Sequence, residues 1–191
     1  MGTVWPVSDT DWKLDASDGE LLVRTGVTGR AAKMGHRLTL LMNSWNATVR
    51  WADGAPVAVH MTVDVDGLAV SHGEGGLMAL SGPEKSIARS HALKSLDAAR
   101  FPTISFRADD IAQTDGGYRL GGTVEIHGTS RGCVVDLRVE DLRGAWRMSG
   151  EADIRQTEFG VKPYSMLMGS MKVVDVVTVV FTAVRNDGPG R

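Results

Sequence analysis

Ala99-Arg-Phe-Pro-Thr-Ile-Ser-Phe-Arg-Ala-Asp109 is the stretch where a helical segment ends and an alternating strand begins. Pro102 disfavours the α conformation for the residue before it, so the helix has to end there and the chain leaves in an extended form. Beyond it, Thr103, Ser105 and Arg107 alternate with apolar or small residues, which predicts a strand with one wet and one apolar face. We expect the segments on both sides to belong to one sheet.

Composition limits the class of protein. The 191 residues, 42% of them apolar, suffice for one sizeable core and predict a single domain. A net charge of −2, evenly spread, argues against a nucleic-acid groove, which needs clustered Lys and Arg. The single cysteine, Cys133, and a start without a signal-like basic or apolar run indicate a reducing, cytoplasmic location. No window approaches the roughly 18 apolar residues of a spanning helix, which leaves peripheral membrane contact as an option.

The first half of the chain contains several alternating segments. A first hairpin is predicted around Asp18-Gly19, and residues 57–66 form the cleanest strand, with nine positions of period two. Residues 71–82 are rich in glycine and are interpreted as a connection. Ser81-x-x-Glu84 has the spacing of a capping box, and it predicts a helix over roughly residues 83–98.

The second half extends the sheet. We expect a hairpin turn at residues 115–117, a second turn at residues 128–132, and further strands up to residue 184. These are about eight strands with short connections, so the sheet is antiparallel, and closing it hides its edges. The predicted fold is therefore all-β: an extended eight-stranded antiparallel, lipocalin-like barrel with one inserted helix and room for packed side chains or one small ligand.

Three motifs follow one another in a characteristic order: Arg89-x-His91-x-Leu93, Arg100-Phe-Pro-Thr-Ile-Ser-Phe106, and Tyr118-x-Leu120-x-Gly122-Thr-Val124-x-Ile126-x-Gly128-Thr129. With them the chain resembles the YceI-like family of lipocalin-like, polyisoprenoid-binding proteins, over roughly residues 12–184. The resemblance implies non-enzymatic binding, transport or storage of a long-chain amphiphile such as a polyisoprenoid, quinone or fatty-acid-like lipid, with no cofactor. The segment Lys33-Met-Gly-His-Arg-Leu38 departs from the family pattern.

Candidate ligand-binding residues come from the inward faces of the predicted strands and from the expected barrel mouth. They are Trp45, Trp51, Met61, Ile104, Phe106, Leu120, Gly122, Val124, Ile126, Phe159, Tyr164 and His36. The strand residues either line a tunnel or fill a solid core. His36 is a candidate contact for a polar head group. Gly122 either leaves room inside the barrel or serves the backbone through a bend or a positive φ.

Other features have simpler interpretations. The five histidines show no metal-ligand spacing, and Cys133 is expected to be buried and inert. Met166, Met168 and Met171 form either an adaptable portal or ordinary packing. Four basic residues near the expected mouth either bind a pyrophosphate or are solvated charges; they are Lys33, Arg37, Lys162 and Lys172.

Three functions remain open from the sequence. The first is a carrier of a long apolar chain, with a homodimer as one assembly to consider. The second is a small isomerase or cyclase that uses the same cavity with His36 or Asp175 as its acid or base, although no paired-carboxylate or nucleophile-base motif supports it. The third is a packed interaction domain without a ligand.

Overall fold

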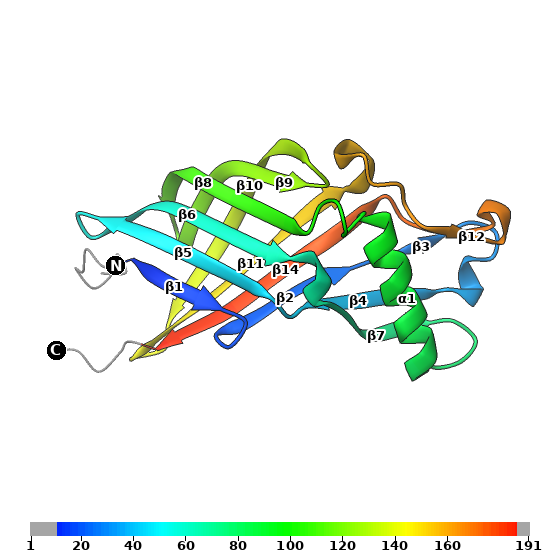
Figure 1. Cartoon of the computed structure of the whole chain (residues 1–191). Helices are drawn as coiled ribbons and strands as arrows, with labels where there is room; N and C mark the ends of the chain where they lie inside the picture. Colours follow the sequence, from blue (N-terminus) through cyan, green and yellow to red (C-terminus); the bar gives the residue numbers. More distant parts are fainter. Residues whose placement is uncertain (1–10, 187–191) are drawn as a thin grey trace.

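The computed structural model describes residues 11–186 and shows a sheet that curls into a half-barrel, with one helix across its end (Figure 1). Eleven strands form this sheet: β1 (Trp12–Asp15), β2 (Gly19–Arg24), β4 (His36–Met42), β5 (Trp45–Ala52), β6 (Ala55–Asp64), β7 (Leu68–Gly75), β8 (Thr103–Thr114), β9 (Gly117–Ile126), β10 (Thr129–Asp141), β11 (Ala145–Arg155) and β14 (Val176–Asn186). Their spatial order is β1-β5-β6-β8-β9-β10-β11-β14-β2-β4-β7. Neighbours pair antiparallel throughout, as β5–β6 and β8–β9 illustrate.

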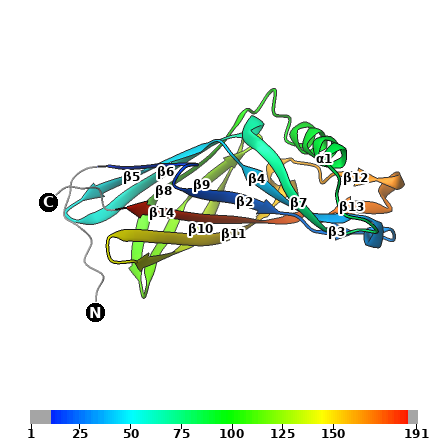
Figure 2. The same ribbon diagram turned by 90° about the horizontal axis from the view of Figure 1, so that it is seen from below.

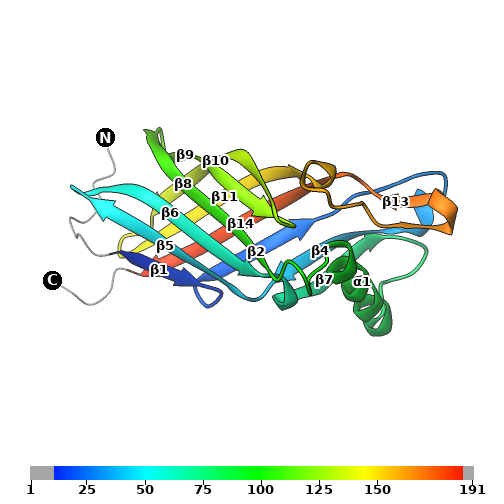
Figure 3. The same ribbon diagram turned by 45° about the horizontal axis from the view of Figure 1, so that its top comes forward.

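A second, three-stranded sheet lies at the end where the helix crosses (Figure 2). It pairs β12 (Ser165–Met166) with β13 (Met171–Val173), and β13 with β3 (Val27–Thr28). The single α-helix is α1 (Gly82–Ser95), and four short 3-10 turns complete the elements: η1 (Ala32–Met34), η2 (Val65–Gly67), η3 (Gln156–Phe159) and η4 (Leu167–Gly169). We call the end of the curled sheet where α1 crosses it the helix end. The β5–β6, β8–β9 and β10–β11 turns lie at the opposite, turn end (Figures 1 and 3).

Residues 36–75 form one long hairpin, and both of its arms change direction at the same level; we call this place the corner. The first arm is β4 and β5, which only Asn43 and Ser44 separate, and the second is β6 and β7, which η2 separates. Beyond the corner β4 pairs with β7, and before it β5 pairs with β6. Hydrogen bonds across the corner join Asn43 N to Gly67 O at 3.0 Å and Asp64 N to Ser44 O at 2.8 Å. The same hairpin therefore contributes to two separate stretches of the curled sheet.

The number of strands corrects the sequence-based expectation. The fold is all-β with one helix, as predicted, but the curled sheet has eleven strands and not eight. The corner is the main reason, because it divides each arm of the long hairpin into two strands with different neighbours. Residues 71–82, interpreted as a connection, supply the second half of β7, since backbone pairing with β4 continues to Gly75.

Two turn predictions were also wrong. Within residues 11–186 no ladder joins β1 to β2; β1 pairs with β5, and β2 pairs with β14 and β4. The reason is that both edges of β2 are already paired, one with β14 and the other with β4, so neither is available to β1. The turn expected at residues 128–132 is shorter, because His127 and Gly128 alone take positive φ values of 53° and 69°, and β10 begins at Thr129.

The helix begins where the capping box predicts. The Ser81 hydroxyl accepts a hydrogen bond from Glu84 N, and the Glu84 carboxylate accepts one from Ser81 N at 2.8 Å. Arg89 then holds α1 against the corner, because its guanidinium donates to Leu68 O at 2.7 Å and to Asp66 O at 2.6 Å. The helix ends at Ser95, three residues before the end predicted from Pro102.

Gly122 serves the backbone by a route that the sequence did not indicate. Its φ is not positive; instead β8 carries a bulge between Ala108 and Asp110, opposite Gly121 and Gly122. A Cβ at Gly122 would overlap the Arg107 carbonyl oxygen and lie 2.8 Å from Ala108 Cα. The glycine is therefore required because β8 lies against it, and its missing side chain leaves no free space.

We expect Gly122→Ala to lower the free energy of unfolding by about 1–3 kcal/mol, because the added methyl group meets backbone that cannot move without breaking the ladder. Urea unfolding followed by tryptophan fluorescence measures the change. The matched control is Gly132→Ala on the neighbouring strand β10, where a Cβ meets nothing within 4 Å and φ is not positive. Equal stability of the two variants would show that the approach of β8 does not constrain Gly122.

Candidate ligand-binding cavity

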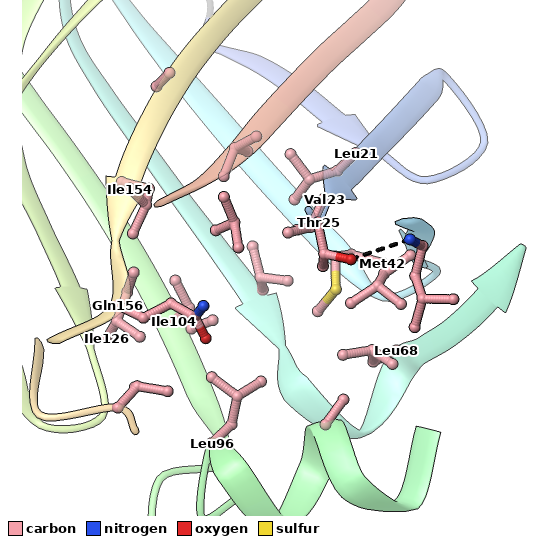
Figure 4. Close-up of a pocket in the computed structure, with 18 of the residues that line it drawn as sticks. Leu21, Val23, Thr25, Met42, Leu68, Leu96, Ile104, Ile126, Ile154 and Gln156 are labelled. Carbon is pink, nitrogen blue, oxygen red and sulfur yellow. Dashed lines mark hydrogen bonds between the residues drawn. The ribbon is translucent and has the colours of Figure 1, made fainter. Parts of the chain in front are cut away.

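An apolar cavity of about 700 Å³ extends from the inner side of α1 into the curled sheet (Figure 4). Side chains from opposite walls face one another across it, among them Val23 on β2, Ile104 on β8 and Ile154 on β11. Leu96, directly after α1, closes it from below in this view. Its volume falls within the range of sites for small organic ligands, about 300–1,000 Å³.

Strand alternation explains why the cavity is apolar. Along β6, Val59, Met61 and Val63 point into it, and the residues between them point outward. The outer face carries the charged pairs; for example, Arg119 Nε donates to Asp136 Oδ1 at 2.7 Å between β9 and β10. Since the sheet is curled, inward side chains from all eleven of its strands converge on one space.

Nine of the twelve predicted ligand-binding residues border this cavity. They are His36, Met61, Ile104, Phe106, Leu120, Val124, Ile126, Phe159 and Tyr164. The other three, Trp45, Trp51 and Gly122, do not border it. Trp45 points inward but packs edge-on against Phe181, with ring centroids 5.5 Å apart, and Phe181 separates it from the cavity wall.

Large aromatic residues fill the turn end of the sheet. Trp12 and Trp51 lie 4.9 Å apart at 48°, and Tyr118 and Trp146 are buried in the same cluster. The guanidinium of Arg185 lies 4.8 Å from the ring centre of Trp12 and covers this end from outside. Trp51 therefore belongs to a packed aromatic floor and does not border the cavity.

Aromatic and polar side chains surround the mouth at the helix end. The His91 ring on α1 stacks on the Tyr164 ring at 4.3 Å and 29°, which ties the helix to the loop before β12. His36 Nε2 lies 2.8 Å from Met78 O and so fixes the loop before α1. Hydrogen bonds from Ser81 hold the pKa of Glu84 below its usual value, which keeps a carboxylate beside His36.

Two polar side chains of the lining, Thr25 and Gln156, form hydrogen bonds with backbone. The Thr25 hydroxyl accepts from Leu38 N at 3.0 Å, the bond drawn in Figure 4. Gln156 Nε2 donates to Val174 O at 3.0 Å. These groups join strand ends where the ladders stop, so the middle of the cavity presents mainly carbon atoms, and an alkyl or isoprenoid chain matches such a surface.

Two residues considered for chemistry are placed by the structure. Cys133 borders the cavity, and burial raises the pKa of its thiol, which favours the unreactive protonated form. Asp175 does not border it; hydrogen bonds from the hydroxyl and the amide of Thr157 lower its pKa. Across residues 11–186, no group of three His, Cys, Asp or Glu side chains is arranged to hold a metal ion.

The candidate residues left out large parts of the lining, including β10 and β11, and two parts are instructive. One is the inner face of α1, with Ile87, Ala88, His91 and Ala92, whose spacing of three and four residues was a usable signal. The other is the pair of neighbouring strands β2 and β14. Their alternating apolar residues were assigned to strands but not to the cavity, because their position relative to the helix depends on the tertiary fold.

A family model described as "YceI-like domain" matches residues 12–184 of the chain. No curated protein matches the sequence. Among solved structures, Burkholderia cenocepacia BcnA has a TM-score of 0.67 at 16% identity, covering 91% of this chain and 99% of BcnA. The Campylobacter jejuni YCEI protein has a TM-score of 0.58 at 14% identity, covering 78% of this chain and 84% of that protein. One of its mutants was crystallised with a monobromobimane guest. At these identities the likeness shows a shared fold.

Tyr118, which is buried in the floor, should lower the stability of the protein at high pH. Burial raises the pKa of Tyr118 from 10.0 to about 12, and the unfolded chain ionises near 10.0. Neutral Tyr118 therefore makes its full contribution to the free energy of unfolding below pH 10. This contribution is lost as the pH rises toward 12, and the free energy of unfolding falls by up to about 1.4 kcal/mol per pH unit. Urea unfolding between pH 9 and pH 12 should show this loss. Tyr118→Phe should flatten it and Tyr164→Phe should not; the same pH profile in both variants would contradict the assignment.

Proposed function

The chain belongs to the YceI-like domain family, and from this premise we propose that it binds and carries a long apolar chain, such as a polyisoprenoid, a quinone or a fatty-acid-like lipid. The observation that carries the proposal is the 700 Å³ cavity, whose walls are mainly aliphatic and most of whose polar side chains lie toward the helix end. A floor of packed tryptophan and tyrosine side chains limits how deep a chain can enter. The chain's tail is proposed to lie along the strands, with its head at the mouth.

The helix supports this interpretation. No residue of α1 is fully buried, although Ala92, Leu93 and the following Leu96 contact the core. The helix therefore lies over a hollow, and its inner face has few atoms to pack against until a ligand fills the space. Because an unfilled apolar space forfeits dispersion contacts, a bound chain would add packing to α1 and to the walls together.

The head group is proposed to contact His36 and Lys172. Both border the cavity at its mouth, His36 on β4 and Lys172 on β13. A cation and an imidazole suit a phosphate or carboxylate head. The departure of residues 33–38 from the family pattern places a different set of side chains at this position, so the head group need not be that of other members.

We also propose that the cavity carries its ligand without catalysis. Its one thiol, Cys133, is kept in the protonated form by burial, and Asp175 lies outside the lining. The mouth carboxylate of Glu84 caps α1, where it accepts hydrogen bonds from the Ser81 amide and hydroxyl. These groups have structural partners, and no nucleophile-base pair among them supports the isomerase or cyclase alternative.

Native mass spectrometry of freshly purified protein, followed by organic extraction, tests the proposal directly. We expect one isoprenoid, quinone or fatty chain for each protein chain, because one cavity holds one tail. Stripped protein should regain one equivalent from added polyprenyl phosphate or quinone. Recovery of no ligand together with no uptake of either compound would favour a packed interaction domain.

Two alanine-to-leucine substitutions distinguish a residue that lines the cavity from one in the packed core. Ala152 on β11 borders the cavity, whereas Ala183 on β14 is 2% exposed in the packed floor. Ala152→Leu should leave the stability of the ligand-free protein nearly unchanged and lower ligand uptake, because the new side chain occupies the ligand's space. Ala183→Leu should lower stability by about 1–3 kcal/mol. Loss of stability in Ala152→Leu with unchanged uptake would place the ligand elsewhere.

A further inference from the structure

Exposed apolar side chains gather at the helix end. Of the ten large apolar residues that are exposed within residues 11–186, seven lie around the cavity mouth; they are Met34, Leu77, Met78, Ile87, Met166, Leu167 and Met168. We call these seven the apolar rim. They come from η1, the loop before α1, α1 itself and the β12–β13 hairpin, which Figures 1 and 3 show together at that end. Soluble surfaces rarely concentrate apolar side chains in this way without a partner.

The hairpin between β12 and β13 presents its apolar residues outward. Met168 is fully exposed, at 102%, and Leu167 at 55%. Both residues take the left-handed conformation, with φ values of 52° and 51°, which L-residues seldom adopt. In this turn the side chains of two large apolar residues therefore extend beyond the sheet instead of folding back over the cavity.

Basic residues outnumber acidic residues around the apolar rim. Residues 26–37 and 160–173, which contain the three strands of the small sheet, carry five Lys or Arg and no Asp or Glu, in a chain of net charge −2. The neighbouring residues 71–95 hold two acidic residues, Glu74 and Glu84, and three basic ones, Lys85, Arg89 and Lys94. Glu74 also pairs with Arg37 at 3.3 Å. The helix end is therefore basic, and the acidic excess lies on the rest of the molecule.

We propose that the helix end docks on a bilayer that contains anionic lipids. The apolar rim enters the boundary between head groups and acyl chains, and the basic side chains meet the lipid phosphates. Met34, Ile87 and Met166 border the cavity as well as belonging to the rim, so the docked mouth faces the lipid directly. A second copy of the chain fits this surface less well, because a two-fold interface would bring the same basic segments together.

The docking itself does not depend on the proposed function. Its purpose, the transfer of an apolar chain between bilayer and cavity, does rest on that function. Flotation of ligand-free protein with vesicles of phosphatidylcholine, alone or mixed with phosphatidylglycerol, tests the docking itself. We expect binding to the mixed vesicles that weakens with added salt. No binding to the mixed vesicles would overturn the docking and leave the carrier proposal standing. Binding to the vesicles without any uptake of an apolar chain would overturn the carrier proposal and leave the docking standing.

Matched variants identify the surface. Leu167→Ser/Met168→Ser should weaken vesicle partition by about tenfold or more, since two apolar side chains lose their burial in lipid. The control, Val134→Ser/Leu142→Ser, changes exposed apolar residues on β10 and its turn, away from the helix end, and should bind as the native chain does. Equal weakening in both double variants would overturn the assignment, as would a sedimentation result in which the rim variants convert a dimer to monomers.

A charge-reversal variant and its control test the role of the basic residues. Lys33→Glu/Lys162→Glu should reduce binding to mixed vesicles by about tenfold or more, whereas Lys13→Glu on β1 at the far end should not. All of these positions are exposed, so the variants should fold, and circular dichroism with a thermal scan checks this. If Leu167→Ser/Met168→Ser misfolds, Leu77→Ser/Met78→Ser replaces it. Unchanged binding of both the charge variant and the rim variant would show that another surface meets the bilayer.

Discussion

The corner in the long hairpin determines where the rest of the structure can go. At Asn43 and Ser44 in one arm, and at η2 in the other, the chain changes direction and each arm changes its neighbours. Gly67 is needed there, because a Cβ would lie 2.7 Å from Ser44 Cβ and 2.9 Å from Ser44 N. The corner also holds α1, since Arg89 donates to the carbonyl oxygens of Asp66 and Leu68. The same corner therefore changes the strand neighbours and positions the helix.

The interior has two halves with different packing. At the turn end, bulky rings such as Trp12, Trp51 and Trp146 are buried together in a packed core. Toward the helix end, most of the inward side chains are Val, Ile, Leu and Met, with a few phenylalanines, and they leave a space between the walls of the curled sheet. The cavity is thus a consequence of side-chain size along otherwise similar strands. The tryptophans stabilise the sheet, and the aliphatic residues leave it hollow.

The mouth combines the features that distinguish this chain. The segment of residues 33–38 departs from the family pattern and supplies Lys33, Arg37 and His36. His36 holds the loop before α1 through Met78 O. The stacked pair His91 and Tyr164 closes one side of the opening. Met34, Ile87 and Met166 belong both to the lining and to the exposed rim, so an apolar chain that leaves the cavity would meet the rim next.

The sequence by itself determined the class of the fold, most strands and turns, the start of α1 and the apolar character of the interior. These follow from local rules: period-two alternation shows which residues share a face, and the Ser81–Glu84 pair shows where a helix begins. Nine of twelve candidate residues were found in the lining for the same reason.

Only the tertiary structure decided which strands are neighbours and how far along the interior each residue lies. Alternation cannot show that β1 pairs with β5, that Trp51 belongs to the floor, or that β8 lies against Gly122. Each of these depends on contacts between segments far apart in the chain, and period two repeats identically at every register that keeps the same face inward.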